Sequence, residues 1–471
     1  MPKSKLFKEV QEKLSRQVHP AHDQYPPATR KAVDPFCKTY LDFLNRAKTE
    51  RLAVAEIERT AQKAGFKALG PKTRGAKVYQ TYRGKAAAIA YLGSQPLENG
   101  INLVVSHIDS PRLDLKPNPL YEDLGLALLK THYYGGIRKH QWVARPLALY
   151  GVVVRHDGQT VKVALGDQSD EPCLTITDLL PHLSANAQNG KKFSEAIPGE
   201  KLNVVVAGRP LGDPADGKNR IKYHVLQLLQ QKYGMKEEDF ISAELEIVPA
   251  GPAREVGLDR SLIGAYGQDD RICAYTALRA ITDLATTPKR TAVALFLDKE
   301  EIGSYGNTGA DARFLLDFVG DLLARLGLGD ERSIRRVLAG SQVLSADVNA
   351  AIDPEWPEVH DKLNAAQLGG GICLTKYTGS RGKSGGSDAN AEFVGKIRRL
   401  LNEAKVPWQI GELGKTDEGG GGTVALFFAG YGADVLDAGP ALLSMHSPFE
   451  LAHKDDVYSA YLTYKTFYGK A

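Results

Sequence analysis

Several short apolar runs in this chain end in histidine or carboxylate residues, and this pattern constrains the fold more than any other feature. The run INLVVSHID ends in His107 and Asp109, AVALFLDKEE ends in Glu300 and Glu301, and SQVLSAD ends in Asp347. Runs of this kind are typical of strands buried on both faces of a parallel sheet. Because the carboxyl ends of such strands open on one crevice, the pattern predicts that these side chains converge on one site.

The order of helical and strand-like segments predicts one α/β domain that is interrupted by a β-rich insert. Helical patterns over about residues 1–18 and 34–65 precede the strands AAAIAYLG and INLVVSHID, which we expect to be neighbours. From about Ala265 helices alternate again with buried strands, of which RVLAGSQVLSAD is predicted to be one. We expect an α/β fold, with a mixed sheet flanked by helices, from residues 1–117 and 251–471, and a β-rich insert over residues 118–250.

Composition excludes several classes of protein. The formal net charge of the 471 residues is only +4, and the basic residues are dispersed, which argues against nucleic acid or an anionic membrane as a partner. The four cysteines form no CxxC pair, which excludes a thiolate zinc ribbon and fits a reducing compartment. No stretch approaches the ~18 to 20 apolar residues of a membrane span. We expect a cytoplasmic protein that acts on small molecules or peptides.

The polar residues that end the apolar runs are of the types that bind catalytic metal ions. Two further candidates are Asp269, directly before a helical pattern where capping alone would explain it, and His446, after GPALLSM. Singly, each such histidine or carboxylate has an ordinary structural explanation. Together they form a set of histidines and carboxylates without cysteine, which is typical of a catalytic zinc, manganese or cobalt site. Two divalent cations would compensate the adjacent charges of Glu300 and Glu301, together with Asp269 and Asp347.

Five stretches of the sequence resemble, in order and spacing, the aspartyl aminopeptidase and aminopeptidase I family of dinuclear zinc exopeptidases. They are SHIDSPRLDLKP, GQDDRICAYTAL, DKEEIGS, SAD and SMHSPFELAHKDD. The resemblance implies a zinc exopeptidase-like catalytic domain in which Asp269 bridges two metal ions, His107 and Asp347 complete one site, and Glu301 and His446 complete the other. It further implies that Glu300 is the general base and that Asp109 orients His107 or the attacking water.

The resemblance also extends to the insert and to the substrate. It implies that the insert is a dimerisation domain, that His182 reaches into a neighbouring subunit's active site, that Lys376 contacts substrate, and that dimers assemble into a dodecamer. One departure is VNAAIDPEW, with Asn349 and Asp353, where the aspartyl-specific branch is rich in histidine. Whether the enzyme prefers an acidic or a neutral N-terminal residue therefore stays open.

The sequence thus predicts a metal-dependent aminopeptidase that releases N-terminal residues from peptides, with two divalent ions per subunit, most simply zinc, with cobalt or manganese as alternatives. A dinuclear carboxypeptidase or deacylase would share the metal chemistry but needs a cationic group for the substrate carboxylate. A non-catalytic, self-assembling binding protein is a third alternative. The intact Glu300 and the five intact ligand positions argue against it.

Overall fold

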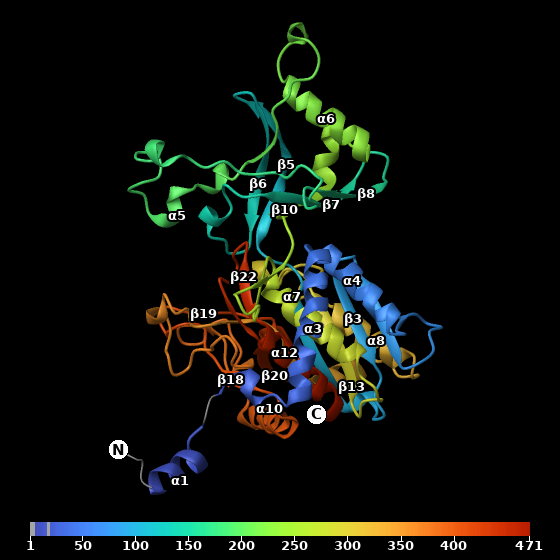
Figure 1. Ribbon diagram of the computed structural model, residues 1–471. Coiled ribbons are helices and arrows are strands. Elements are labelled where there is room, and N and C mark those ends of the chain that lie inside the picture. Colours follow the sequence, from blue (N-terminus) through green and yellow to red (C-terminus); the bar gives the residue numbers. More distant parts are fainter. Residues whose placement is uncertain (1–4, 17–18) are drawn as a thin grey trace.

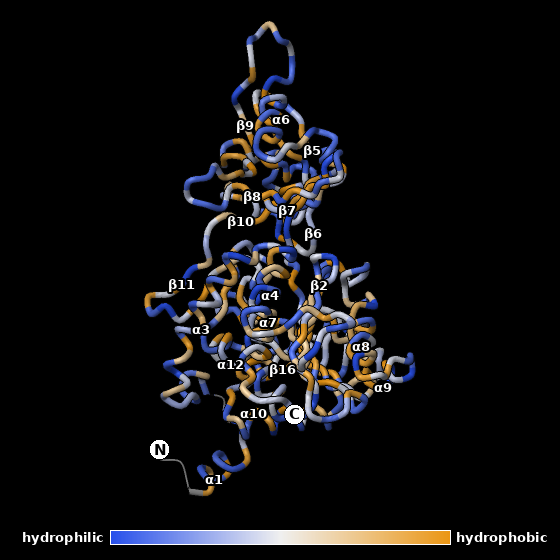
Figure 2. The backbone as a smooth tube through the Cα atoms, turned by 90° about the vertical axis from the view of Figure 1, so that its right-hand side faces the viewer, coloured by the Kyte–Doolittle hydropathy of each residue, from blue (hydrophilic) through white to orange (hydrophobic). Residues whose placement is uncertain are grey.

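The computed structural model describes residues 5–16 and 19–471, which form two lobes (Figure 1). The lower lobe contains a nine-stranded sheet, the upper lobe contains a six-stranded sheet, and the lobes stay separate when the molecule is turned by 90° (Figure 2). Helix α1 (Lys5–Leu14) projects from the base of the lower lobe. It covers part of the helix predicted over residues 1–18, whose residues 1–4 and 17–18 lie outside the described residues.

The nine-stranded sheet is mixed, and its centre is parallel. Its order is β1 (Lys67–Ala68), β2 (Lys77–Tyr82), β3 (Ala86–Tyr91), β13 (Thr291–Leu297), β4 (Ile101–His107), β14 (Gln342–Ser345), β20 (Asp434–Gly439), β16 (Ile372–Thr375), β18 (Trp408–Ile410). Strands β13, β4, β14 and β20 run parallel to one another, whereas β3 and β16 pair with this group antiparallel. The carboxyl ends of four neighbouring strands therefore meet at one edge.

Helices cover both faces of this sheet, which explains why its strands are continuous apolar runs. One face carries α3 (Pro27–Arg46), α4 (Glu50–Lys63), α7 (Gln268–Thr282), α10 (Ala391–Ala404) and α12 (Lys454–Lys470). The other carries α8 (Phe314–Ala324), α9 (Glu331–Ala339) and α11 (Ala425–Ala429). In β4, Val104 packs into the first layer, and Leu103 and Val105 pack into the second. This arrangement confirms the predicted α/β fold with a mixed sheet between helices.

The upper lobe is an antiparallel sheet built from one continuous part of the chain, residues 112–249, which we call the insert. Its order is β8 (Thr160–Leu165), β7 (Leu147–Val154), β10 (Ala243–Pro249), β5 (Arg112–Asp123), β6 (Leu126–Tyr134), β9 (Val204–Ala207). Helix α6 (Arg220–Tyr233) packs its Ile221 and Val225 into the core of this lobe, and α5 (Phe193–Ala196) lies in a long loop. The predicted division of the chain into domains, with its dimerisation role for the insert, stays a prediction.

Smaller elements complete the fold. A five-stranded sheet has the order β11 (Arg254–Val256), β12 (Leu262–Ala265), β22 (Glu450–His453), β21 (Ala441–Leu443), β15 (Asn349–Ala350), and β17 (Gly379–Ser380) pairs with β19 (Gly420–Gly421). The short helices are α2 (Ala21–Gln24), η1 (Leu97–Asn99), η2 (Lys139–Gln141), η3 (Pro181–Leu183), η4 (Gly199–Lys201), η5 (Pro214–Asp216), η6 (Glu237–Ser242), η7 (Glu300–Ile302) and η8 (Pro357–Val359). Among residues 5–16 and 19–471, none of the helices has the length and apolar character that a membrane span requires.

Three local predictions were wrong. Strands β3 and β4 are not neighbours, because β13 lies between them and pairs with both. The helix predicted over residues 34–65 begins earlier, at Pro27, and is interrupted before Thr49, whose side chain accepts a hydrogen bond from the Leu52 N–H and starts α4. The first half of RVLAGSQVLSAD ends the helix α9, which is capped by Asp330, and only the second half is strand.

Candidate metal centre

The parallel strands bring three of the predicted segments to one edge of the nine-stranded sheet. His107 is the last residue of β4, Glu300 and Glu301 lie in η7 after β13, and Asp347 follows β14. Since β13, β4 and β14 are adjacent and parallel, their carboxyl ends lie side by side. Side chains that are up to 240 residues apart in the sequence thereby meet (347 − 107 = 240).

Two further segments are held at this edge by a buried glutamate that the sequence did not single out. The carboxylate of Glu450 accepts hydrogen bonds from the backbone N–H groups of Gln268 at 2.6 Å, Asp269 at 3.2 Å and His446 at 2.9 Å. It therefore ties the start of α7 to the loop between β21 and β22. No pattern in the sequence points to Glu450, because its partners are backbone groups.

The distances divide the cluster into two groups that share Asp269. Asp269 Oδ1 lies 3.1 Å from His107 Nε2, and Asp269 Oδ2 lies 3.2 Å from His446 Nε2. In the first group His107 Nε2 is also 3.8 Å from Asp347 Oδ1, and in the second His446 Nε2 is 3.3 Å from Glu301 Oε2. Within each group one ligand atom per residue lies within 4.8 Å of the others. Each group could thus surround one metal ion.

The negative charges of these residues and their unpaired carboxylate oxygens are consistent with a bound cation. Among the described residues, Asp269 Oδ1 and Glu301 Oε1 are buried and have no hydrogen-bond partner. Burial is the main cause that raises the pKa of Glu301 and Asp347 well above their ordinary values, since each carboxylate loses solvation beside other negative charges. A divalent ion in each group would compensate these charges, and the donors, imidazole and carboxylate, suit zinc.

Glu300 stands beside the two groups and is a member of neither. Its Oε2 lies 3.9 Å from His107 Nε2, and its side chain is 17% exposed, whereas that of Glu301 is 3% exposed. Burial raises the pKa of the Glu300 carboxyl to about 7, against the opposing charge of His107 and with support from Asp269 and Asp109. A carboxylate with this position and pKa can exchange protons near neutral pH.

Asp109 supports both His107 and the segment that carries the glutamates. It is fully buried, and its Oδ1 lies 3.3 Å from His107 Nδ1. The same carboxylate accepts hydrogen bonds from the N–H groups of Glu300 at 3.2 Å and Glu301 at 3.3 Å, and from the Tyr134 hydroxyl at 2.8 Å. Burial alone would raise the pKa of Asp109, but the hydrogen bond and charge of His107, the Tyr134 hydroxyl and the charge of Arg112 lower it.

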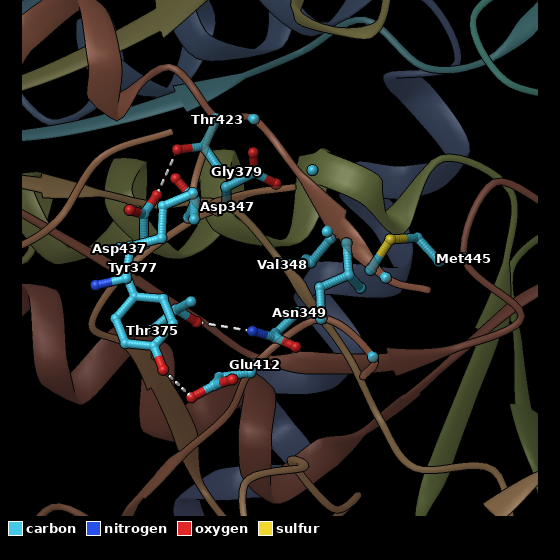
Figure 3. A pocket seen from close by; sticks show the side chains of 18 of the residues that line it. Asp347, Val348, Asn349, Thr375, Tyr377, Gly379, Glu412, Thr423, Asp437 and Met445 are labelled. Atoms are coloured by element: carbon cyan, nitrogen blue, oxygen red, sulfur yellow. Dashed lines mark hydrogen bonds between the residues drawn. The ribbon is translucent and has the colours of Figure 1, made fainter. Parts of the chain in front are cut away.

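The cluster opens on a cavity of about 610 Å³, whose wall includes Asp269, Glu300, Glu301, Asp347 and His446. The glycine run Gly419–Gly422 and the neighbouring Thr423 also line it. Figure 3 shows three hydrogen-bonded pairs in the wall: Asn349–Thr375 at 2.7 Å, Tyr377–Glu412 at 2.5 Å and Thr423–Asp437 at 2.7 Å.

The sequence analysis did not identify Asp437 as a cavity residue, although it lies beside Ser345 near the end of the parallel strand β20. Burial raises its pKa to about 6.

Two predicted site residues, His182 and Lys376, are not brought into the cluster by the described part of the chain. His182 lies in the 3₁₀ helix η3 of the insert, where it is exposed. Lys376 lines a neighbouring cavity with Tyr377 and Trp408, and its Nζ lies 4.0 Å from Asp388. The roles predicted for both residues stay predictions.

Comparison with known families identifies the chain. Residues 43–468 match the family model described as aminopeptidase I zinc metalloprotease (M18). The chain belongs to this family. As an M18 aminopeptidase it is a metal-dependent hydrolase, which confirms the resemblance and the activity that the sequence predicts.

Similar proteins support this membership over most of the chain. A probable M18 family aminopeptidase 1 of Thermotoga maritima is 49% identical over 445 residues, which cover 94% of this chain and 97% of the relative. The crystal structure of an M18 aminopeptidase from Thermotoga maritima superposes with a TM-score of 0.91 at 47% identity, covering 97% of this chain and 100% of that one. The structure of an S. cerevisiae mApe1 dodecamer, at 22% identity, a TM-score of 0.72, and coverage of 93% and 97%, shares the fold.

Proposed function

We propose that this M18 aminopeptidase uses a dinuclear zinc centre in which Asp269 bridges the two ions. His107 and Asp347 would complete one site, and Glu301 and His446 the other. The observation that carries the proposal is the position of Asp269, whose two carboxylate oxygens lie 3.1 and 3.2 Å from the Nε2 atoms of two different histidines. A single-ion site would not need one carboxylate to face two separate groups of ligands.

The chain's own residues supply the proton transfer. Ions held in the two groups would polarise the scissile carbonyl and lower the pKa of a water molecule. Glu300, which belongs to neither group, accepts the proton of the attacking water and passes it to the leaving amine. Asp109 keeps Glu300 in place through its backbone N–H and keeps the His107 ring oriented. The glycine run Gly419–Gly422 lets the peptide backbone of the substrate approach the cavity wall.

Metal removal tests the dinuclear centre directly. Purified protein should contain two equivalents of metal per chain, lose activity when a chelator strips them, and regain it with added zinc. Replacement of His446 by alanine should lower the metal content to about one equivalent. A wild-type content of one equivalent at saturating zinc would contradict the proposal, and cobalt or manganese restoring more activity than zinc would change the identity of the ion.

We also propose a preference for neutral N-terminal residues. Next to Asp347 the cavity wall includes Val348, Asn349, Thr375 and Met445 (Figure 3). In the described part of the chain Asn349 Oδ1 is buried without a hydrogen-bond partner. Because this oxygen can only accept, it would leave the side-chain carboxylate of an acidic N-terminal residue without a donor, which costs about 1–3 kcal/mol. The cationic Arg381, Lys383 and Lys415 also line the cavity, but all three are exposed. Leucyl and methionyl anilides should therefore be cleaved at least about tenfold faster than the aspartyl anilide. Faster cleavage of the aspartyl anilide would contradict the proposed preference.

Finally, we propose that the insert, taken as residues 118–250, pairs subunits and that the dimers form a dodecamer. The helix η3 that carries His182 exposes three leucines nearby, Leu179 at 43%, Leu180 at 50% and Leu183 at 65%, as an interface would. The S. cerevisiae mApe1, which shares the fold, is a dodecamer, and this supports the proposal. Within the dimer His182 would face the partner's cavity.

We propose a cytoplasmic location, because the four cysteines, which all lie in the described part of the chain, are free thiols.

A further inference from the structure

A short segment of the insert touches the outer side of both groups of ligands. Where β6 ends, the Tyr134 hydroxyl donates a hydrogen bond of 2.8 Å to Asp109 Oδ2, and Asp109 in turn lies against His107. Two residues later the Gly136 carbonyl oxygen lies 2.9 Å from His446 Nδ1. The segment Tyr134–Gly136 therefore reaches one histidine through an aspartate and the other directly.

These contacts determine which imidazole nitrogen is free to bind an ion. A carbonyl oxygen can only accept, so His446 Nδ1 must carry the proton that it shares with Gly136. The backbone carbonyl of Asp109, 3.1 Å from His107 Nδ1, fixes that ring in the same way. With Nδ1 engaged in this way, Nε2, which points to Asp269 in both rings, is the nitrogen that would bind an ion.

Gly135 brings the backbone of this segment against a third ligand. Its φ is +71°, and a Cβ at this position would lie 3.3 Å from Glu301 Cβ and 3.4 Å from Glu301 Oε2. A side chain would be strained here and would press on the carboxylate. Only glycine allows the insert to approach Glu301 this closely.

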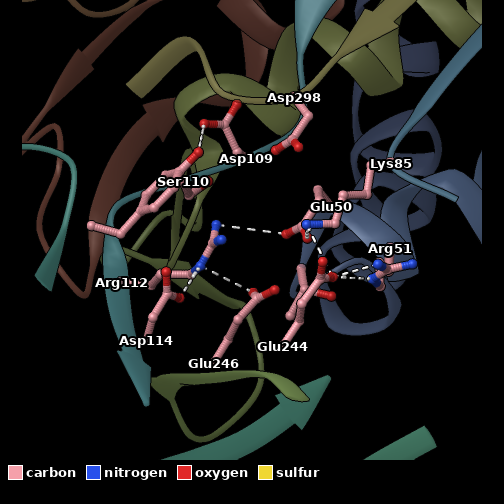
Figure 4. Close-up of polar contacts among 12 residues, drawn as sticks. Glu50, Arg51, Lys85, Asp109, Ser110, Arg112, Asp114, Glu244, Glu246 and Asp298 are labelled. Carbon is pink, nitrogen blue, oxygen red and sulfur yellow. Dashed lines mark hydrogen bonds and ion pairs between the residues drawn. The ribbon is translucent and has the colours of Figure 1, made fainter. Parts of the chain in front are cut away.

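Arg112 anchors the segment from the side of the insert. Its guanidinium carbon lies 3.9 Å from the centre of the Tyr134 ring. The guanidinium is itself buried among carboxylates, with Nε 2.8 Å from Asp114 and 3.3 Å from Glu246, and Nη1 3.6 Å from Glu50 (Figure 4). Asp114 and Glu246 belong to β5 and β10 of the insert, and Glu50 belongs to α4 of the other lobe. The position of the Tyr134 ring is thereby tied to the packing of the two lobes.

We propose that Tyr134–Gly136 is a positioning segment through which the insert orients both histidine ligands and Glu301, and so sets the affinity of the centre for metal. The inference rests on the ligand assignment proposed above. Tyr134 does not line the cavity as described, so it acts through Asp109 rather than on the substrate. Outer partners of this kind typically contribute ~10- to 100-fold to metal affinity or activity.

Tyr134→Phe is the sharpest test, because it keeps the ring on Arg112 and removes only the hydroxyl. The dissociation constant for Zn²⁺, measured by competition with a chromogenic chelator, should rise ~10- to 100-fold, and kcat at saturating zinc should fall while KM changes little. The absorption spectrum of the Co²⁺-substituted protein should shift. Tyr150→Phe is the matched control: it removes a 2.8 Å bond from a tyrosine to Asp167 in the same sheet and should leave zinc affinity and kcat unchanged.

Gly135→Ala tests the contact with Glu301 independently. It should weaken zinc binding at the site of Glu301 and His446, so that one of two equivalents is lost first. Gly125→Ala is its control, because Gly125 has a similar φ of +79° in the insert, and a Cβ there would meet no described atom within 4 Å. Both variants carry similar backbone strain, so the difference between them measures the crowding of Glu301.

Parallel measurements separate this inference from the ligand assignment. If Asp269→Asn loses its metals while Tyr134→Phe binds zinc and turns over like Tyr150→Phe, the positioning role is overturned and the dinuclear centre stands. If Asp269→Asn keeps both metals, the ligand assignment itself fails. Thermal melting of the metal-free proteins completes the test. If Tyr134→Phe lowers the melting temperature but leaves zinc affinity normal, Tyr134 has a structural role only, and the proposal is again overturned.

Discussion

Glu300 and Glu301 are adjacent in the chain, yet their carboxylates face different histidines. Glu301 Oε2 lies 3.3 Å from His446 Nε2, whereas Glu300 Oε2 lies 3.9 Å from His107 Nε2. Both residues sit in the 3₁₀ helix η7, and both backbone N–H groups are held by the one carboxylate of Asp109. This difference supports the proposed roles, in which Glu300 is the general base and Glu301 is a metal ligand.

The different positions predict different consequences of mutation. Glu300→Gln should keep both metals, because the five proposed ligands remain, while kcat falls by at least ~10² to 10⁴ through loss of the general base. Metal analysis beside steady-state kinetics checks this. If the metals were gone, Glu300 would be a ligand and the roles of the two glutamates would be exchanged.

Asp269 and Asp270 provide a second contrast between neighbours. Asp269→Asn should abolish activity and lower the metal content, because Asp269 is the one residue shared by both groups of ligands. Asp270→Asn should be much milder, since Asp270 belongs to neither group and its Oδ2 accepts a long 3.4 Å contact from the His107 N–H. A silent Asp269 together with an inactive Asp270 would move the bridge by one residue.

Subunit mixing tests the proposed role of His182. His182→Ala and Glu300→Gln should each be inactive, the first because one donor to the developing oxyanion typically contributes ~10² to 10³ in kcat. After subunit exchange the mixture should regain partial activity, since some sites then combine an intact base from one chain with an intact His182 from the other. Exchange is followed with differently labelled subunits. Proven exchange without recovery would place His182 outside the partner's site.

The buried charges around Arg112 predict a large effect on stability. Arg112→Leu leaves Glu246 buried without its cation and Glu50 with Lys85 as its remaining cation, and it should lower the free energy of unfolding by about 3–5 kcal/mol. The control is Arg59→Leu, which breaks a pair with Glu56 whose arginine is 53% exposed and should change the free energy by no more than about 1 kcal/mol. Urea denaturation of the metal-free variants measures both. Equal effects would mean that the Arg112 cluster adds nothing beyond a surface pair.

The sequence could predict the ligand cluster because its members obey a rule of parallel sheets. His107, Glu300, Glu301 and Asp347 each follow an apolar run, and strand ends on one edge converge whatever the rest of the fold does. The bridging role that we propose for Asp269 was suggested by the family resemblance alone, since a carboxylate at a helix start is usually a cap. The sequence did not point to Glu450, which binds backbone N–H groups, or to Tyr134, which binds Asp109 beside His107. Contacts of these kinds leave no local pattern in the sequence.

The order of the strands was also beyond the sequence. Strands β3 and β4 are close in the chain and equally apolar, and nothing local shows that β13 pairs with both. That choice depends on pairings such as Val293 with Leu103 and Ala294 with Ile89, which form only in the complete sheet. The interruption between α3 and α4 escaped for a similar reason, since apolar residues continue at helical spacing across it.

The place of β13 between β3 and β4 has a consequence for synthesis on the ribosome. Its two partners are complete at His107, but β13 ends at Leu297, about 190 residues later, which corresponds to roughly 10–40 s at ~5–20 residues per second. During that interval β3 and β4 are already synthesised, but the strand β13 that pairs with both of them is not. All six strands of the insert lie between Arg112 and Pro249, so the insert can fold while they wait, and the sheet that carries the catalytic residues closes after it.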